Sequence, residues 1–346
     1  MKMKEISFYD AKPYDKIYFE KLKEKYGFEI VYHETKLNPN SVKMAEGSDA
    51  ICAFVNDTID QKVIEELKKM NIEVIAMRCA GYNNVNLEAA FGNVHIVRVP
   101  AYSPYAVAEF ALGMILCLNR KIFHAYNRTR EFNFSLNGLT GFDLRGKTLG
   151  VVGTGKIGRV FMEVCSGLGM KIIAYDPYPV ANSDIQYVSF EELCKSSDII
   201  SLHCPLTKES YHLINKESIA LMKKGVYIIN TSRGALIDTE ALVEALKHEK
   251  IGAAGLDVYE EESEIFYEDF SNSIIQDDVI ARLMTFPNVL VTSHQAFLTN
   301  EALSNIAETT LENLKEFFDD SELTNEVCYH CQMDNSCKKE HKARCF

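Results

Sequence analysis

Residues 147–176 read KTLGVVGTGKIGRVFMEVCSGLGMKIIAYD and decide the fold of the part of the chain in which they lie. Residues 148–152 form a short apolar run, which is typical of a buried strand. The glycine-rich turn GTGKIG follows at 153–158, then residues with helical spacing as far as Gly169, then a second apolar run that ends in Asp176. This order predicts a strand–turn–helix–strand unit of a parallel α/β sheet.

The glycine motif suits the binding of a dinucleotide. Gly153 permits a tight turn, Gly155 lets the backbone approach a pyrophosphate, and Gly158 lets the following helix pack closely on its strand. The N-terminus of that helix would point its free N–H groups at the pyrophosphate. The Asp176 carboxylate can accept hydrogen bonds from both adenosine ribose hydroxyls and would repel a 2′-phosphate, which favours NAD over NADP. The alternative is a βαβ turn that holds no ligand.

Length and charge limit the remaining possibilities. The chain has 346 residues, enough for two domains, and 47% of them are hydrophobic. A formal net charge of −12 disfavours nucleic acid or an anionic membrane as the main partner. The first ten residues lack the apolar core of a signal peptide, and the most apolar stretch, residues 106–118, is too short to span a bilayer. We therefore expect a cytoplasmic protein.

Strand-like and helical segments alternate along most of the chain, which predicts parallel sheets covered by helices. Strands are expected near residues 6–9, 28–32, 50–55, 72–77, 198–204, 225–230, 252–257 and 288–293, in addition to the two around the glycine motif. Helices are expected at 15–26, 59–70, 105–123, 190–195, 216–222, 239–248 and 302–318. The predicted fold class is α/β, with two doubly wound parallel-sheet domains.

Three polar residues lie just beyond predicted strands of the second half: Arg233, Glu262 and His294. Carboxyl ends of parallel strands share one edge of a sheet, so these side chains can converge there. Hydride transfer to a 2-oxo acid needs a cation for the carboxylate, a proton donor for the developing alkoxide, and a carboxylate to orient that donor. Each residue also has an ordinary interpretation: a capped strand end, a solvated acidic run and a core histidine.

A further candidate turn follows the predicted strand at 72–77. Ala80 and Gly81 lie at the carboxyl end of that strand and are small enough to offer backbone N–H groups to an anion. An ordinary glycine turn is the equally good alternative.

Seven segments together resemble the D-specific 2-hydroxyacid dehydrogenase family, and within it the fermentative D-lactate dehydrogenases most. They are RCAGYNNV (78–85), VPAYSP (99–104), GTGKIG (153–158), CPLT (204–207), NTSRG (230–234), LDVYEEE (256–262) and SHQAF (293–297). The resemblance covers roughly residues 3–328. It implies a flavodoxin-like substrate domain (1–102 with 299–327), a Rossmann NAD-binding domain (103–298), a separate tail (328–346) and a homodimer.

The resemblance also implies residue roles. Arg233 would bind the substrate carboxylate, His294 would act as acid/base, and Glu262 would be its partner. The substrate-binding residues would be Ala80, Gly81, Tyr102 and Phe297. The cofactor-binding residues would be Gly153, Thr154, Gly155, Lys156, Ile157, Gly158, Asp176, Cys204, Pro205, Thr231 and Asp257, the last holding the nicotinamide carboxamide.

The implied activity is NAD-dependent, reversible reduction of pyruvate to D-lactate. Two alternatives remain open from the sequence. One is the same chemistry on a bulkier 2-oxo acid, such as phenylpyruvate or 2-oxoisocaproate. The other is a non-catalytic NAD(H)-sensing protein, because corepressors of the same fold can retain these residues.

The cysteines fall into two groups. Six of the ten are scattered, mostly in apolar runs, as expected for buried thiols in a reducing cytosol. The other four crowd into the last 19 residues, which lie beyond the family pattern. Cys328, Cys331, Cys337, His341 and Cys345 could hold zinc or, through the thiolates, an iron–sulfur cluster. A disordered or oxidised extension is the alternative.

Overall fold

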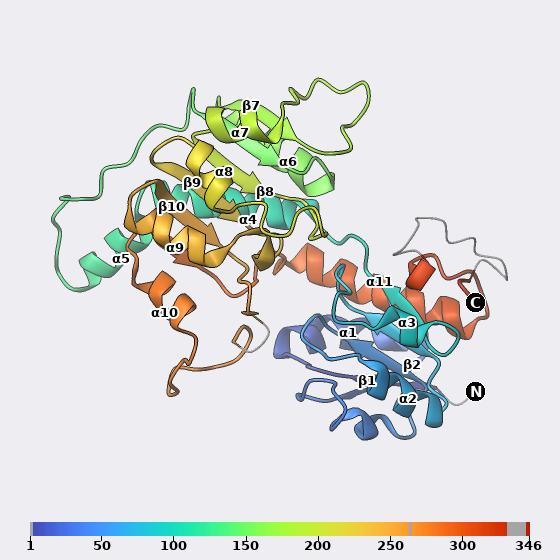
Figure 1. Cartoon of the computed structure of the whole chain (residues 1–346). Helices are drawn as coiled ribbons and strands as arrows, with labels where there is room; N and C mark the ends of the chain where they lie inside the picture. The colour runs from blue at the N-terminus through green and yellow to red at the C-terminus, as the bar shows by residue number, and fades with distance from the viewer. Residues whose placement is uncertain (1–2, 263–264, 331–343) are drawn as a thin grey trace. The chain divides into compact units, whose positions relative to one another are not determined.

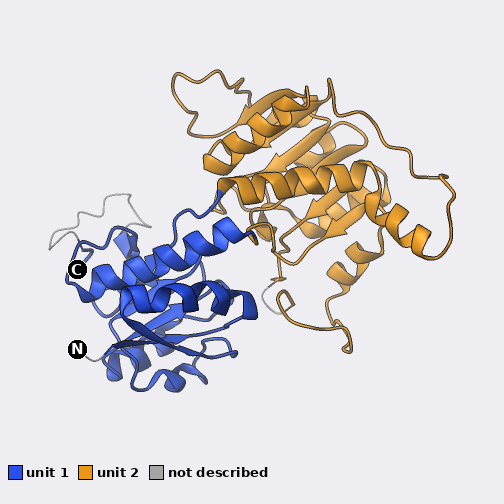
Figure 2. Cartoon of the chain, turned by 180° about the vertical axis from the view of Figure 1, so that it is seen from behind, with its two compact units in different colours: residues 1–103, 299–346 blue, residues 104–298 orange. Residues whose placement is uncertain are grey.

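The computed structural model describes residues 3–262, 265–330 and 344–346. The chain forms two compact units, each built around its own parallel sheet (Figure 2). Unit 1 combines Met1–Ser103 with Thr299–Phe346, and unit 2 is the continuous stretch Pro104–Leu298. The predicted fold class, two parallel-sheet α/β domains, is confirmed.

Unit 1 contains a six-stranded sheet in the order β12-β5-β4-β3-β1-β2 (Figure 1). The first five strands in chain order are parallel and follow the flavodoxin-like order, while β12 is antiparallel to β5. The strands are β1 (Lys4–Phe8), β2 (Phe28–Tyr32), β3 (Ala50–Ala53), β4 (Val74–Met77), β5 (His95–Arg98) and β12 (Glu326–Val327). The helices are α1 (Pro13–Tyr26), α2 (Gln61–Lys69), α3 (Leu87–Ala90) and α11 (Asn300–Phe318), with a 3₁₀ turn, η1 (Val42–Ala45).

Helix α11 carries the end of the chain back to unit 1. Thr299 caps it, because the Thr299 side chain accepts a hydrogen bond from Ala302 N. Ala307, Leu311 and Leu314 recur at helical spacing and are buried with the apolar residues of the strands and of α1. This face of α11 therefore completes the core of unit 1.

Unit 2 contains a second six-stranded parallel sheet, in the order β11-β10-β9-β8-β6-β7. The strands are β6 (Thr148–Val152), β7 (Lys171–Tyr175), β8 (Ile199–Leu202), β9 (Val226–Asn230), β10 (Ile251–Leu256) and β11 (Val289–Val291). The helices are α4 (Pro104–Asn119), α5 (Ile122–Arg130), α6 (Lys156–Gly167), α7 (Phe190–Ser196), α8 (Lys216–Leu221), α9 (Thr239–Lys247) and α10 (Asp278–Thr285), with a 3₁₀ turn, η2 (Gly234–Leu236).

A single bridge completes the Rossmann strand order. Tyr187 pairs in parallel with Ala174 on the outer side of β7. Counting this bridge as the third strand, the sheet runs 3-2-1-4-5-6, with β11 added at the far edge.

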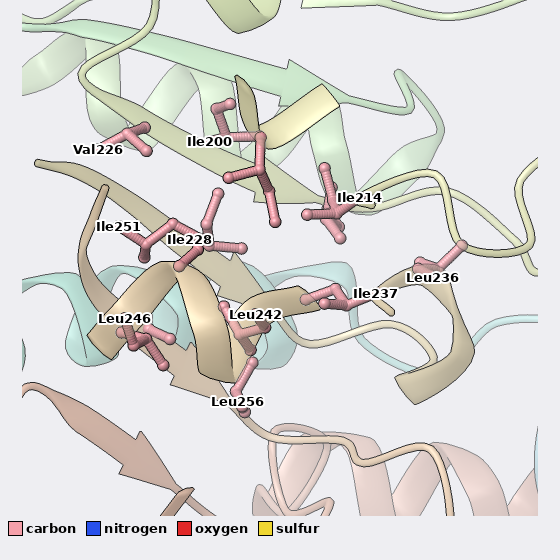
Figure 3. Packing of buried hydrophobic residues seen from close by; sticks show 14 of the residues in the cluster. Ile200, Ile214, Val226, Ile228, Leu236, Ile237, Leu242, Leu246, Ile251 and Leu256 are labelled. Carbon is pink, nitrogen blue, oxygen red and sulfur yellow. The ribbon is translucent and has the colours of Figure 1, made fainter. Parts of the chain in front are cut away.

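Packing of α9 shows how helices cover the sheet of unit 2. Asp238 caps α9 by accepting a hydrogen bond from Ala241 N, as its position in the sequence predicts. Leu242 and Leu246, one turn apart, face Ile228 and Ile251 on the strands below (Figure 3). Burial of such side chains stabilises the fold by roughly 1.5–3 kcal/mol each.

The prediction of one helix over residues 105–123 is wrong at its C-terminal end. Helix α4 ends at Asn119, Lys121 adopts a left-handed backbone with φ of 52°, and α5 then begins at Ile122. None of the nine residues of α5, all of them described, is buried. Among the helices that the structure describes, none combines the length and apolar character needed to cross a lipid bilayer.

Candidate active site

Three adjacent strands, β9, β10 and β11, bring the predicted catalytic segments to one edge of the unit 2 sheet. Leu256, the last residue of β10, pairs with Asn230 of β9 and with Val291 of β11, which also end their strands. The chain beyond is tied together, because Asp257 N donates to Asn230 O (2.9 Å) and His294 N donates to Asp257 O (2.7 Å). The segments carrying Arg233, Glu262 and His294 therefore leave the sheet side by side.

His294 and Glu262 form a direct pair. His294 Nδ1 lies 2.9 Å from Glu262 Oε1, and both side chains are mostly buried, with exposed fractions of 17% and 18%. Glu262 Oε2 accepts a hydrogen bond from Tyr259 N (3.0 Å), and the Tyr267 hydroxyl donates to His294 O (3.0 Å). Because Nδ1 is engaged by the carboxylate, Nε2 is the ring nitrogen left to exchange a proton.

Asp257 anchors the loop that carries His294. Its carboxylate accepts hydrogen bonds from Thr292 Oγ1 (2.6 Å), Gln295 N (2.9 Å) and Ala296 N (2.9 Å). Burial raises the pKa of Asp257, and these hydrogen bonds act in the opposite direction. They hold His294 in a left-handed backbone with φ of 51°, which costs a non-glycine residue about 1 kcal/mol or more. Sequence reasoning missed this anchoring; the predicted contact of Asp257 with the nicotinamide remains a prediction.

Arg233 lies in the turn after β9, and its guanidinium is the positively charged group that a ligand carboxylate would need. Its Nη1 donates to Ser232 O (2.6 Å), and Asn230 Nδ2 donates to Arg233 O (2.8 Å). Gly234 is required beside it, because a Cβ there would lie 2.0 Å from the backbone carbon of Tyr259. Within the described part of the chain, no carboxylate lies at ion-pair distance from the Arg233 guanidinium.

The glycine motif has the shape that its sequence predicts. Gly153 has φ of 94°, and a Cβ there would lie 2.6 Å from His203 O. A Cβ at Gly158 would lie 2.1 Å from Gly153 O, so the first and third glycines are needed for packing. A Cβ built at Gly155, by contrast, has no described atom within 4 Å. The open space at Gly155, before the first turn of α6 at Lys156 and Ile157, fits the pyrophosphate of a dinucleotide.

The other predicted cofactor residues follow neighbouring strands. Asp176 comes directly after β7, Cys204 and Pro205 follow β8, and Thr231 follows β9. Thr231 Oγ1 is buried without a hydrogen-bond partner among the described atoms, so it has a hydrogen bond to give. Burial raises the pKa of Cys204 to about 11, which keeps the thiol neutral near pH 7. These residues fit a neutral amide and ribose of NAD.

The predicted substrate residues are divided between the units. Ala80, Gly81 and Tyr102 belong to unit 1, and Phe297, which is buried, belongs to unit 2. Ala80 O accepts a hydrogen bond from Arg98 Nη1 (2.7 Å), and Tyr102 O accepts one from Asn305 Nδ2 (2.7 Å). These backbone bonds fix the two segments within unit 1.

The cysteine-rich tail is described at its two ends. Cys328 is buried and Cys345 half-buried, and Cys345 N donates to Glu326 Oε2 (2.6 Å). Cys331, Cys337 and His341, on which the metal hypothesis depends, lie outside the described residues. Within residues 3–262, 265–330 and 344–346 no group of three His, Cys, Asp or Glu side chains could hold a metal ion.

Fold and site together define a two-unit dinucleotide-binding protein with a histidine–carboxylate pair at the sheet edge. Residues 112–296 match the family model of the D-isomer specific 2-hydroxyacid dehydrogenase NAD binding domain. The D-lactate dehydrogenase of Escherichia coli (strain K12) is 53% identical over 313 residues, which are 89% of this chain and 95% of that protein.

Two solved structures are also similar over nearly their whole length. The structure reported for the pyruvate reductase of Chlamydomonas reinhardtii has a TM-score of 0.89 at 43% identity, covering 94% of this chain and 99% of that one. The structure of a D-2-hydroxyisocaproate dehydrogenase has a TM-score of 0.82 at 35% identity, covering 93% and 99%. The chain belongs to the D-isomer specific 2-hydroxyacid dehydrogenase family, and its predicted cofactor, NAD, is confirmed.

Proposed function

We propose that the protein is an NAD-dependent D-lactate dehydrogenase that reversibly reduces pyruvate to D-lactate. The observation that carries the proposal is the pairing of His294 with Glu262, 2.9 Å apart, in a loop that leaves the same sheet edge as Arg233. A histidine oriented by a carboxylate is suited to proton transfer near neutral pH. The similarity to the E. coli D-lactate dehydrogenase supports pyruvate as the substrate.

In the proposed reaction each of three residues has one task. Arg233 binds the substrate carboxylate through two parallel hydrogen bonds, which its guanidinium is shaped to give. His294 donates the proton on Nε2 to the carbonyl oxygen, which becomes the product hydroxyl, and takes this proton back in the reverse direction. Glu262 holds the ring through Nδ1 and stabilises the imidazolium before the proton leaves.

NAD would be held by the segments that follow β6, β7, β8 and β9. When bound, NADH supplies the hydride that reduces C2 of the 2-oxo acid. Gly155 and the N-terminus of α6 would bind the pyrophosphate, Asp176 the adenosine ribose, and Thr231 and Asp257 the nicotinamide end. Ala80, Gly81 and Tyr102 of unit 1 and Phe297 of unit 2 are the proposed substrate-binding residues, the first two through their backbone N–H groups.

A cytoplasmic, fermentative homodimer is part of the same proposal. Cys52, Cys165 and Cys194 are buried thiols, which suits a reducing compartment. Large apolar side chains are exposed beyond α5, where a second copy could cover them.

A bulkier 2-oxo acid is the second candidate substrate. The observation that favours it is the similarity to the D-2-hydroxyisocaproate dehydrogenase, at 35% identity over nearly the whole chain. The same three residues would act on it, because the reacting atoms are unchanged. A non-catalytic NAD(H) sensor remains the alternative from another class.

Steady-state NADH oxidation tests the proposal, with pyruvate, 2-oxobutyrate, 2-oxoisocaproate and phenylpyruvate compared by kcat/KM and the configuration of the product determined. We expect the highest kcat/KM on pyruvate and a D-configured product. A higher kcat/KM on 2-oxoisocaproate or phenylpyruvate would assign the second candidate. NADH binding without turnover of any substrate would favour the sensor.

A further inference from the structure

The carboxylate of Asp176 is held by the protein itself. Its Oδ2 accepts hydrogen bonds from Thr154 N (2.7 Å) and Thr154 Oγ1 (2.9 Å), and its Oδ1 accepts one from Tyr178 N (2.9 Å). A carboxylate has about four acceptor positions, two on each oxygen. Oδ2 is therefore filled, and Oδ1 keeps one position, so Asp176 has room for one ribose hydroxyl and not for the two that the sequence suggests.

Tyr187 completes a directed chain of hydrogen bonds that ends on this carboxylate. Val180 N donates to the Tyr187 hydroxyl (3.0 Å), and this hydroxyl donates to Thr154 Oγ1 (2.9 Å). Thr154 Oγ1 in turn donates to Asp176 Oδ2. Each hydroxyl accepts one bond and gives one, so removal of the Tyr187 hydroxyl frees Thr154 Oγ1 to turn away from Asp176.

The fold fixes Tyr187 in this position independently of a ligand. Tyr187 is the residue that bridges to Ala174 of β7, and the chain on either side is bonded to the same residue. Ala174 N donates to Gln186 O (2.9 Å), and Val188 N donates to Ala174 O (2.9 Å). Thr154, in the middle of the glycine motif, is almost fully buried. The hydrogen bonds of Tyr187, Thr154 and Asp176 thus link a short third strand, the glycine motif and the end of β7.

We propose that Tyr187 is a positioning residue that, through Thr154, fixes Asp176 for the adenosine ribose and so sets the preference for NAD over NADP. This inference rests on the proposed NAD site. A carboxylate held in place accepts a ribose hydroxyl and repels a 2′-phosphate, whereas a carboxylate that can swing away does both less well. Tyr187 lies outside the glycine motif, and its effect on selectivity is exerted through Asp176.

Fluorescence titration with NADH and with NADPH measures the effect without turnover. For Tyr187→Phe we expect NADH affinity to fall about five-fold, the usual effect of losing one neutral hydrogen bond, with NADPH affinity unchanged or higher. Thr154→Val should act in the same direction, because it removes the hydroxyl between Tyr187 and Asp176. Thr154→Ser, which keeps that hydroxyl, should retain the selectivity of the wild type.

Tyr227→Phe is the matched control, because Tyr227 is another half-buried tyrosine of unit 2 and its ring packs against Phe142, away from this network. It should bind both dinucleotides as the wild type does. Equal losses of NADH and NADPH affinity in Tyr187→Phe, or no loss of either, would overturn the inference. A wild-type protein that does not bind NADH would overturn the proposed cofactor site itself, and the two failures are therefore distinguishable.

Discussion

Replacing Glu262 tests whether this carboxylate orients His294, because the histidine itself is left unchanged. Glu262→Gln keeps the size of the side chain but removes the charge that faces His294 Nδ1. We expect kcat for pyruvate reduction to fall about 100-fold, since a general acid that is wrongly oriented loses much of its contribution.

The control for this change is Glu261→Gln, which removes the same charge from an exposed neighbour. Its kcat should match that of the wild type. Equal effects of the two substitutions would mean that the charge of the loop acts generally, and the pairing of Glu262 with His294 would not be functional.

His203 is expected to make stability sensitive to acid. Its Nε2 lies 2.8 Å from Ser201 Oγ, its Nδ1 is shut off from solvent without a partner among the described atoms, and burial lowers its pKa to about 3. Below about pH 6.5 the unfolded chain binds a proton that the folded chain does not. The free energy of unfolding therefore decreases from pH 6.5 towards pH 3, by up to about 1.4 kcal/mol per pH unit.

His203→Asn removes this proton uptake, so melting temperatures of the variant should fall less steeply between pH 7 and pH 4.5 than those of the wild type. His248→Asn, at an exposed position, should retain the wild-type slope. Parallel curves for His203→Asn and wild type would show that His203 is not the group responsible.

Residue positions were predictable where a strand end fixes them. Arg233 and His294 each lie three residues beyond the last residue of a strand, so the sequence indicates their shared edge. The contacts of Asp257 with Thr292 and of Tyr187 with Thr154 were not predictable, because the partners are 35 and 33 positions apart and no pattern marks them.

At the scale of the element, two glycines at the ends of α6 allow effects on folding and on cofactor binding to be measured separately. Gly155 caps α6 and Gly167 is its last residue, and a Cβ meets no described atom within 4 Å at either position. Gly155→Ala should leave the melting temperature nearly unchanged but weaken NADH binding at least 10-fold, because the methyl group occupies the space for the pyrophosphate. Fluorescence titration with NADH and thermal melting measure the two effects.

Gly167→Ala is the matched control within the same helix. It should raise stability by about 0.5–1 kcal/mol, since alanine is the better helix former, and leave NADH affinity unchanged. Undiminished NADH binding by Gly155→Ala would place the pyrophosphate elsewhere.

The sequence predicted the presence of helices and strands better than it predicted the residues at which they end. The apolar runs predicted every parallel strand of the two sheets apart from β5 (His95–Arg98) and the Tyr187 bridge, because buried parallel strands are continuous apolar segments. The break at Lys121 was missed, since residues on both sides have helical spacing and only a left-handed backbone interrupts them. Strand β12 was missed because two residues carry no periodicity, and its pairing with β5 is decided by tertiary contacts.

At the scale of the whole molecule, the exposed segment after α5 predicts self-association. Phe132, Phe134 and Leu136 are 85%, 71% and 80% exposed, an unusual density of large apolar side chains in a short stretch. A second copy of the chain would remove them from water. Replacing all three with serine should convert a dimer into a monomer in sedimentation velocity experiments.

Ile274→Ser is the control, because Ile274 is 82% exposed in another part of unit 2. It should sediment as the wild type does. A triple variant that remains dimeric would assign the dimer contact to another surface.

The return of the chain to unit 1 could not be predicted from local sequence patterns. The spacing of Ala307, Leu311 and Leu314 indicates that one face of α11 is buried, but it does not say which sheet covers that face. The contact joins residues some 300 positions apart, and the family resemblance supplied what periodicity could not.

Acid/base chemistry at His294 is the central claim, and pyruvate reduction by His294→Asn with NADH tests it most directly. Asparagine tolerates the left-handed backbone found at this position, so the loop should keep its conformation. We predict that NADH affinity stays within about two-fold of wild type while kcat falls by about 1,000-fold or more, with His248→Ala unaffected. Wild-type kcat in His294→Asn would contradict the mechanism.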